Sequence, residues 1–175
     1  GKPIKLMQLT SPSAVYKDQY LTALAEATRN QTLTTLEMPW ENETFALFVK
    51  RLLEQEKGIN LPTDWVPATT LWLIDQGDFI GRVSIRHQLN EELFKLGGHI
   101  GYFIRPSKRD MGYGKKILEL ALPEAKKLGL TKVLVTCDED NISSRKIIEA
   151  NGGILENIVD QGNNFSPKRR YWITI

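Results

Sequence analysis

Between a predicted strand and a predicted helix the chain reads Ile104-Arg105-Pro106-Ser107-Lys108-Arg109-Asp110-Met111-Gly112-Tyr113-Gly114-Lys115. Glycine at positions 112 and 114 lets the backbone approach a ligand closely, because no Cβ intervenes. The free N–H groups and the dipole at the start of the following helix favour an anion such as a phosphate or pyrophosphate. Arg109 supplies mobile positive charge beside that position, and Lys115 is a second source. The glycine spacing differs from that of a Walker loop and of the three-glycine dinucleotide motif.

Hydrophobic periodicity on both sides of this segment predicts a mixed α/β fold. Strands are expected at 4–9, 69–74, 79–89, 98–105, 132–137, 154–159 and 170–175, and helices at 15–27, 43–57, 112–128 and 141–151. Pro123 lies inside the third helix, where we expect a kink rather than a break because the apolar stripe continues beyond it. An antiparallel run followed by a strand–helix–strand crossover predicts a twisted, mostly antiparallel central sheet of about seven strands, with helices on both faces.

Composition limits the class of protein. The 175 residues predict one domain over 1–175, and 41% hydrophobic and 25% charged residues exclude a disordered or fibrous chain. A net charge of +2 gives little reason to expect a nucleic-acid partner, and we interpret Lys168-Arg169-Arg170 as the solvated start of a strand. No apolar run approaches the roughly 20 residues that span a bilayer. The single cysteine, Cys137, excludes an internal disulfide and is interpreted as packing, and no metal-ligand spacing occurs. We expect a cytoplasmic protein.

Three blocks of the sequence resemble the GNAT superfamily of N-acetyltransferases. Arg109-x-x-Gly112-x-Gly114 is similar to the family's Arg/Gln-x-x-Gly-x-Gly/Ala signature. The approach from Ile100 to Pro106 looks like the family's fourth strand, and Asn141-x-x-Ser144 followed by Gly152 resembles its Asn-x-x-Ala/Ser helix and glycine stop. The resemblance covers essentially the whole chain and is strongest over 98–153. Segments such as Gly97-Gly98-His99 look like a little-characterised bacterial branch of predicted acetyltransferases.

The resemblance implies acetyl-CoA as co-substrate, bound by a core at 98–153. The fourth and fifth strands would separate, and the pantetheine arm would pair with the fourth strand, where an N–H near Phe103 or Ile104 would stabilise the oxyanion. The implied pyrophosphate-binding residues are Arg109, Asp110, Met111, Gly112, Tyr113, Gly114 and Lys115. Asn141 and Ser144 would contact the pantetheine arm or support its wall, with a plain helix cap as the alternative for Asn141. Helices and loops at 11–68, including Trp40 and Trp65, would cover the acceptor.

Transfer to an amine needs an unprotonated nucleophile, so a general base is useful. His99, where relatives carry a glutamate, is the first candidate, with a packed structural histidine as the alternative; Glu92 is the second, ahead of Glu91, with a solvated loop as the alternative. The family's usual acid, a tyrosine, would fall at Ile148 and is absent; Tyr102 and Tyr171 are substitutes.

The expected activity is acetyl transfer to a primary amine of a small molecule, peptide or protein terminus. A non-catalytic acyl-CoA sensor and an interaction module without nucleotide are the alternatives. Many family members dimerise, so a homodimer is open.

Overall fold

The computed structural model describes residues 6–29 and 34–175, and it confirms the predicted order of elements. The strands are β1 (Gln8–Thr10), β2 (Ala68–Asp75), β3 (Asp78–Arg86), β4 (Ile100–Ile104), β5 (Lys132–Asp138), β6 (Ile154–Val159) and β7 (Lys168–Thr174). The helices are α1 (Lys17–Thr28), α2 (Phe45–Glu56), α3 (Tyr113–Lys127) and α4 (Ile142–Ala150). Residues 4 and 5 of the predicted first strand lie outside the described residues. Helix α3 runs through Pro123, so the proline does not end it.

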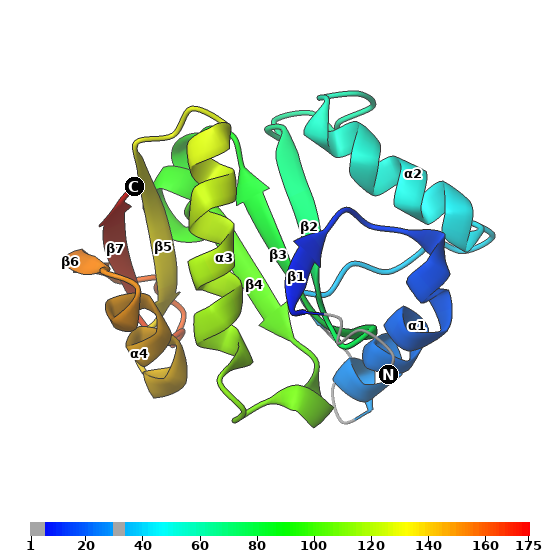
Figure 1. Ribbon diagram of the computed structural model, residues 1–175. Helices are drawn as coiled ribbons and strands as arrows, with labels where there is room; N and C mark the ends of the chain where they lie inside the picture. The colour runs from blue at the N-terminus through cyan, green and yellow to red at the C-terminus, as the bar shows by residue number, and fades with distance from the viewer. Residues whose placement is uncertain (1–5, 30–33) are drawn as a thin grey trace.

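The seven strands form two antiparallel sheets rather than one continuous ladder. One sheet has the order β1-β2-β3-β4 and the other β5-β7-β6. The two sheets are joined at His99 and Leu134, where the His99 N–H donates to the Leu134 carbonyl at 2.7 Å and the Leu134 N–H donates to His99 Nδ1 at 2.9 Å. Beyond that junction β4 and β5 separate, and α3 covers the region from one side (Figure 1).

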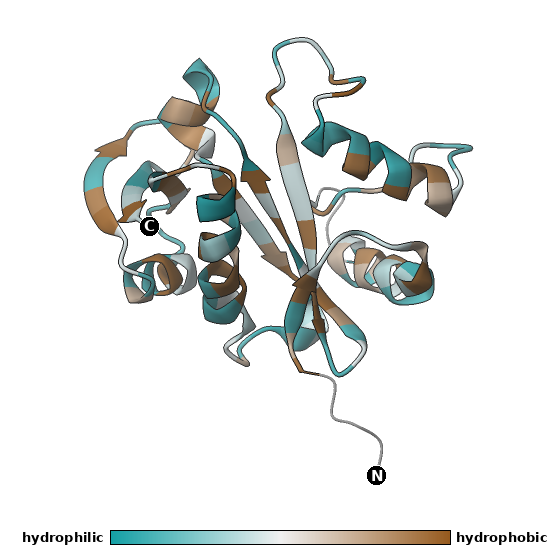
Figure 2. Cartoon of the chain, turned by 45° about the horizontal axis from the view of Figure 1, so that its top comes forward, coloured by the Kyte–Doolittle hydropathy of each residue, from teal (hydrophilic) through white to brown (hydrophobic). Residues whose placement is uncertain are grey.

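Alternating side chains of β2 separate two hydrophobic cores. Leu71 and Leu73 join the core beneath α3, whereas Trp72 joins Tyr20 of α1 and Phe48 of α2 in a second core. Helices α1 and α2 therefore cover one face of the first sheet and α3 covers the other. Figure 2 shows hydrophobic residues concentrated on the strands between these helices. No helix in the described part of the chain has both the length and the apolar character needed to cross a membrane.

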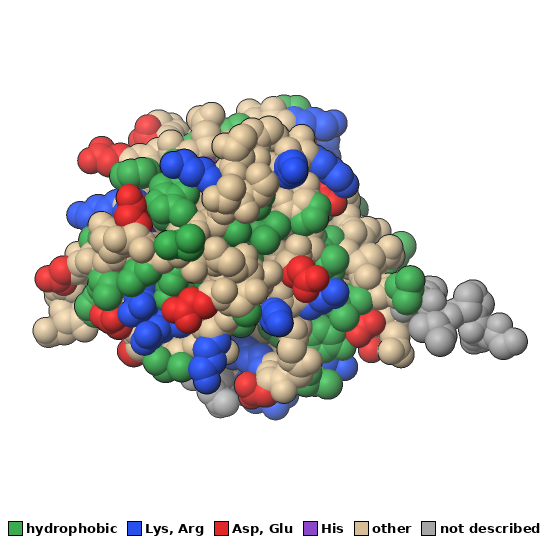
Figure 3. All heavy atoms as spheres, turned by 60° about the vertical axis from the view of Figure 1, so that its left-hand side comes forward, with side chains coloured by type: hydrophobic (Ala, Val, Ile, Leu, Met, Phe, Trp, Pro, Cys, Tyr) green, Lys and Arg blue, Asp and Glu red, His purple; other side chains and the backbone are tan. Residues whose placement is uncertain are grey.

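The basic run at the start of β7 corrects a sequence-based interpretation. Lys168 and Arg169 pair with Asp138 and Glu139, each at 2.9 Å, and Arg170 is buried and pairs with Glu156 at 2.9 Å. The run is therefore built into the second sheet and is not simply solvated. Figure 3 shows the side of the molecule that carries this sheet, where hydrophobic side chains lie among charged ones of both signs.

Glu26 of α1 fixes the end of β4, where the chain turns toward the loop at 109–114. The buried Arg105 guanidinium bonds to Glu26 Oε2 at 2.5 Å and to the Phe79 carbonyl at 3.1 Å. Glu26 Oε1 also accepts the Ser107 N–H at 3.1 Å. These bonds hold the acidic residue, the strand end and the following turn in one arrangement. They lower the pKa of Glu26 to about 2, with the hydrogen bond from Arg105 as the largest cause.

We expect Glu26→Gln to lower the free energy of unfolding by about 3 kcal/mol at neutral pH, because it leaves a buried guanidinium without its counter-charge. A carboxyl whose folded-state pKa is depressed stabilises the fold above its unfolded pKa, and this contribution is lost as pH falls through the folded pKa. The difference between wild type and variant should therefore shrink from about pH 4.5 towards about pH 2. Urea unfolding across this range measures it. Glu119→Gln, which removes an exposed partner of Lys116 on α3, is the control and should change stability by less than about 0.5 kcal/mol. If the difference in unfolding free energy between wild type and Glu26→Gln did not change with pH, the lowered pKa of Glu26 would be contradicted.

Candidate functional site

The loop before α3 presents unpaired backbone donors to open space. Asp110 and Gly112 have positive φ angles of 62° and 86°, which turn the chain sharply into the helix. In the described part of the chain, none of the amides from Asp110 to Lys115 donates a hydrogen bond to a protein acceptor. A Cβ built on Gly112 would meet nothing within 4 Å. Free N–H groups, the positive end of the α3 dipole and an open approach form an anion site.

Gly114 has a different role from the one its place in the motif suggests. A Cβ at this position would lie 2.6 Å from Ile147 Cδ1 of α4. The missing side chain therefore allows α3 and α4 to pack closely, and this packing accounts for the glycine without a ligand. Only Gly112, of the two glycines, borders open space.

Arg109 folds back toward β4. Its Nε donates to the Ile104 carbonyl at 3.0 Å, and its guanidinium carbon lies 5.4 Å from the centre of the Phe103 ring. The side chain is exposed, so its remaining donors can reach a ligand in front of the loop. Asp110, Met111 and Lys115 are exposed in the same turn, whereas Tyr113 donates to Asp75 at 2.6 Å.

The backbone of β4 offers an unpaired edge toward β5. Hydrogen bonds from Arg86 to His99 and from Arg105 to Ile80 frame the ladder between β3 and β4. In an antiparallel pair the direction of the backbone groups alternates, so Gly101 and Phe103 bond to β3 while Tyr102 and Ile104 point away from it. The N–H of Ile104, rather than that of Phe103, is therefore free to meet a ligand between the sheets.

Two hydroxyl side chains meet where β4 and β5 separate. The Tyr102 hydroxyl lies 2.5 Å from Ser144 Oγ of α4. Burial raises the pKa of Tyr102 to about 12; the bond to Ser144 lowers it and the nearby Cys137 raises it further. Burial also raises the pKa of the Cys137 thiol, which is packed as predicted. Asn141 Oδ1 accepts the Ser144 N–H at 3.1 Å, so Asn141 caps α4; its cofactor role stays a prediction.

The geometry argues against His99 as a general base. Its Nδ1 lone pair accepts the Leu134 N–H, so the neutral ring carries its proton on Nε2 and cannot accept another while this bond lasts. Burial, followed by the positive charge of Arg86, lowers the pKa of His99. These features correspond to the structural alternative. Glu92 is exposed on the turn that precedes the π-helix Leu93–Gly97, and its proposed role stays a prediction.

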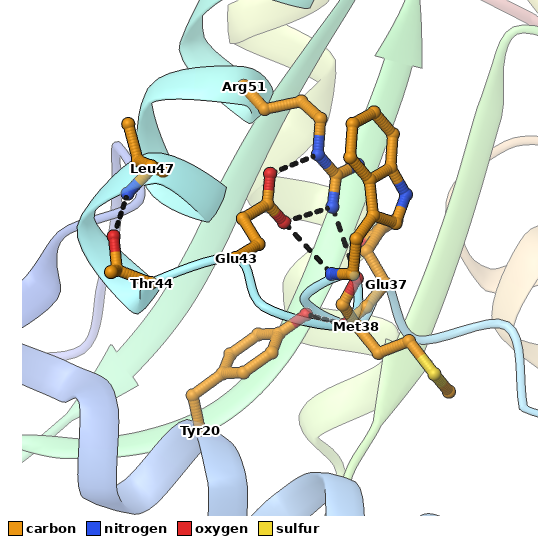
Figure 4. A network of polar contacts seen from close by, with 8 residues as sticks. Tyr20, Glu37, Met38, Glu43, Thr44, Leu47 and Arg51 are labelled. Carbon is orange, nitrogen blue, oxygen red and sulfur yellow. Dashed lines mark hydrogen bonds and ion pairs between the residues drawn. The ribbon is translucent and has the colours of Figure 1, made fainter.

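Residues 37–43, which precede α2, are held over the opposite face of the first sheet, as Figure 4 shows. Tyr20 donates to the Glu37 carbonyl at 2.5 Å, and Arg51 binds both carboxylate oxygens of Glu43 at 2.9 and 3.0 Å. Arg51 also lies 3.9 Å above the ring of the exposed Trp40. Within the predicted acceptor-side region, residues 37–43 are therefore held in place with the Trp40 ring exposed.

Two arginines of β3 lie on this face and were not among the site residues predicted from the sequence. Arg82 is buried and its Nε lies 3.0 Å from Glu37 Oε1, while Arg86 is half-buried and its Nη1 donates to the carbonyls of Gly97 and Gly98 at 3.2 and 3.3 Å. Their spacing could have predicted them, because side chains at i and i+4 of a strand lie on the same face of a sheet and the rest of this strand is mostly apolar.

Comparison with known protein families identifies the family of this chain. Residues 15–154 match the model of the acetyltransferase (GNAT) domain. The matched range includes the loop at 109–115, strands β4 and β5, and the segment before α2. The chain belongs to the GNAT acetyltransferase family. Among curated proteins no sequence matches this GNAT chain significantly.

Solved structures share the fold at low sequence identity. An acetyltransferase from Salmonella typhimurium that modifies the N-terminal serine of ribosomal protein L7/L12 is 16% identical, with a TM-score of 0.69 over 99% of this chain and 98% of that chain. RimL, a ribosomal L7/L12 α-N-protein acetyltransferase in complex with coenzyme A, is 17% identical with a TM-score of 0.68, over 99% and 97%. The microcin C7 self-immunity acetyltransferase MccE, in complex with acetyl-CoA and AMP, is 17% identical with a TM-score of 0.66, over 98% and 93%.

Proposed function

We propose that this GNAT protein transfers the acetyl group of acetyl-CoA to a primary amine by direct attack. The observation that carries the proposal is the row of unpaired amides from Asp110 to Lys115, which opens at Gly112 beside the unpaired edge of β4. A pyrophosphate and an extended amide-containing arm need these two features next to each other. The complexes of RimL with coenzyme A and of MccE with acetyl-CoA show that relatives of this fold accept such a ligand.

In this proposal the cofactor lies in the space between β4 and β5, and the residues around it have separate roles. The Arg109–Lys115 loop binds the pyrophosphate, and the pantetheine arm runs along β4 with the Ile104 N–H polarising the thioester carbonyl. Phe103 and Asn141 line or support the arm. The core at 98–153 thus binds the cofactor, while 11–68 covers the acceptor within one domain over 1–175.

The Tyr102–Ser144 pair supplies the proton that the leaving thiolate needs. The amine nitrogen attacks the thioester carbon, the carbon–sulfur bond breaks, and the Tyr102 hydroxyl proton goes to sulfur while Ser144 stabilises the phenolate that forms. The raised pKa of Tyr102 keeps the phenol protonated before the reaction. The acetylated amine then loses its surplus proton to solvent, and the Tyr102 phenolate takes up one proton from solvent, which restores the neutral phenol. This assignment replaces the tyrosine that is absent at the buried Ile148.

The proposal is tested by titrating acetyl-CoA into the protein in a calorimeter and then measuring release of free CoA thiol with a panel of primary amines. We expect saturable binding and amine-dependent release above the rate of hydrolysis without amine. Binding without turnover of any amine would favour the acyl-CoA sensor. A folded protein that does not bind acetyl-CoA would overturn the proposed function. The oligomeric state stays open.

A further inference from the structure

Arg86 is a half-buried cation on the acceptor face without an ion-pair partner. No carboxylate in residues 6–29 or 34–175 lies within ion-pair distance of its guanidinium, and residues 1–5 and 30–33 contain no aspartate or glutamate. Its neighbour Arg82 already pairs with Glu37. Burial lowers the pKa of Arg86, with the positive charge of Arg82 as the second cause, while the charge of Glu37 raises it without reaching ion-pair distance.

The guanidinium of Arg86 has its parallel donor pair available. Nη1 is occupied by the carbonyls of Gly97 and Gly98, which fix the side chain. Within the described residues, the N–H groups of Nε and Nη2 have no acceptor. These two N–H groups lie on the same edge of the planar guanidinium and match both oxygens of a carboxylate.

The guanidinium of Arg86 lies over Gly101 of β4. A Cβ built on Gly101 would be in ordinary van der Waals contact with Arg86 Nη1, at 3.5 Å. Gly101 is three residues from Ile104, whose N–H marks the place proposed for the reacting carbonyl. At about 3.3 Å per residue this separates the guanidinium from the reacting carbonyl by about 10 Å. A small molecule with an amine at one end and an oxyanion a few bonds away spans that distance.

We propose that the acceptor is a small amine that also carries a carboxylate, and that Arg86 binds this carboxylate. The inference rests on the proposed function, because it names the substrate class of the same site. Arg86 is a specificity-determining residue here, since it holds the end of the acceptor that does not react. The carboxylate supplies the ion-pair partner that Arg86 lacks.

The test compares ω-amino carboxylates of increasing chain length with their matched carboxamides as acceptors, using wild type, Arg86→Gln and Lys95→Gln. We expect wild type to prefer the carboxylates, with an optimum chain length. Arg86→Gln should lower kcat/KM for the carboxylates by about 10- to 100-fold, mainly through KM, and leave the carboxamides within about 3-fold. Lys95→Gln removes an exposed nearby charge and should leave both series unchanged.

Three results would overturn the inference. Equal losses for carboxylates and carboxamides in Arg86→Gln would make Arg86 a structural tie to Gly97 and Gly98. A wild-type preference for carboxamides or for uncharged peptide N-termini would assign a different acceptor class while leaving acetyl transfer intact. If no amine is turned over, titration of the carboxylates into the protein saturated with CoA still measures the site, and absence of binding overturns the inference. Failure of the proposed function is distinct, because it appears as failure to bind acetyl-CoA.

Discussion

Gly112→Trp should lower the affinity for acetyl-CoA by at least about 100-fold, equivalent to about 2.8 kcal/mol, while the protein stays folded. A Cβ at Gly112 points into open space, so the indole would occupy the region in front of the free amides without displacing a core residue. The φ angle of 86° adds a strain of about 1–2 kcal/mol, which affects stability more than binding. Calorimetric titration together with thermal unfolding separates the two effects.

Gly129→Trp is the matched control for this variant. Gly129 follows the opposite end of α3, has a φ of 93°, and its Cβ would also meet nothing within 4 Å. The backbone strain is therefore similar, but the indole lies far along the helix from the loop. We expect a similar loss of stability and unchanged affinity. Equal affinity losses in both variants, or none in Gly112→Trp, would contradict the location of the pyrophosphate.

Tyr102→Phe should lower kcat by about 100-fold and change the dissociation constant of acetyl-CoA by less than about 3-fold, because the hydroxyl acts on the leaving thiolate. Since the pKa of Tyr102 is raised to about 12, the neutral donor form dominates at every lower pH. The alkaline side of the wild-type kcat profile should therefore show no loss from this group below about pH 11. Steady-state kinetics across pH, with binding measured separately, provides both quantities.

Three further variants test this prediction more closely. Ser144→Ala should have a smaller effect, and the double variant Tyr102→Phe/Ser144→Ala should be little worse than Tyr102→Phe, because the two hydroxyls act as one unit. Tyr16→Phe, which also removes one phenolic hydroxyl, should retain the wild-type kcat. An unchanged kcat in Tyr102→Phe would assign proton delivery elsewhere, and a matching loss of acetyl-CoA affinity would give Tyr102 a binding role only.

The sequence predicted those parts of the molecule that depend on neighbours along the chain. The order of strands and helices followed from hydrophobic periodicity, and the turn before α3 followed from its glycines. A helix cap by Asn141 could also be considered from the sequence, because its side chain bonds to a residue only three positions later in the chain.

Contacts between distant residues could not be obtained in this way. Gly114 fits the signature equally well whether it faces a ligand or Ile147, and only the packing of α3 on α4 decides between them. The pairs Tyr102–Ser144 and Glu37–Arg82 join residues that no local pattern connects. His99 was predicted within the fourth strand but lies just before β4, which begins at Ile100. Its Nδ1 lone pair is used by a backbone N–H from β5, and periodicity carries no information on that bond.

Within the residues that the structure describes, the two sheets bond to each other only at His99 and Leu134, and this gives the cofactor a mechanical role in the proposed function. A pantetheine arm that bonds to the free edge of β4 occupies the position of an eighth, non-peptide strand in the gap where the ladder is interrupted. A ligand that binds only the folded protein raises the free energy of unfolding in proportion to the logarithm of the ligand concentration, once that concentration exceeds the dissociation constant. The cellular supply of acetyl-CoA would then set how rigidly the two halves of the protein are joined, as well as how fast it can work.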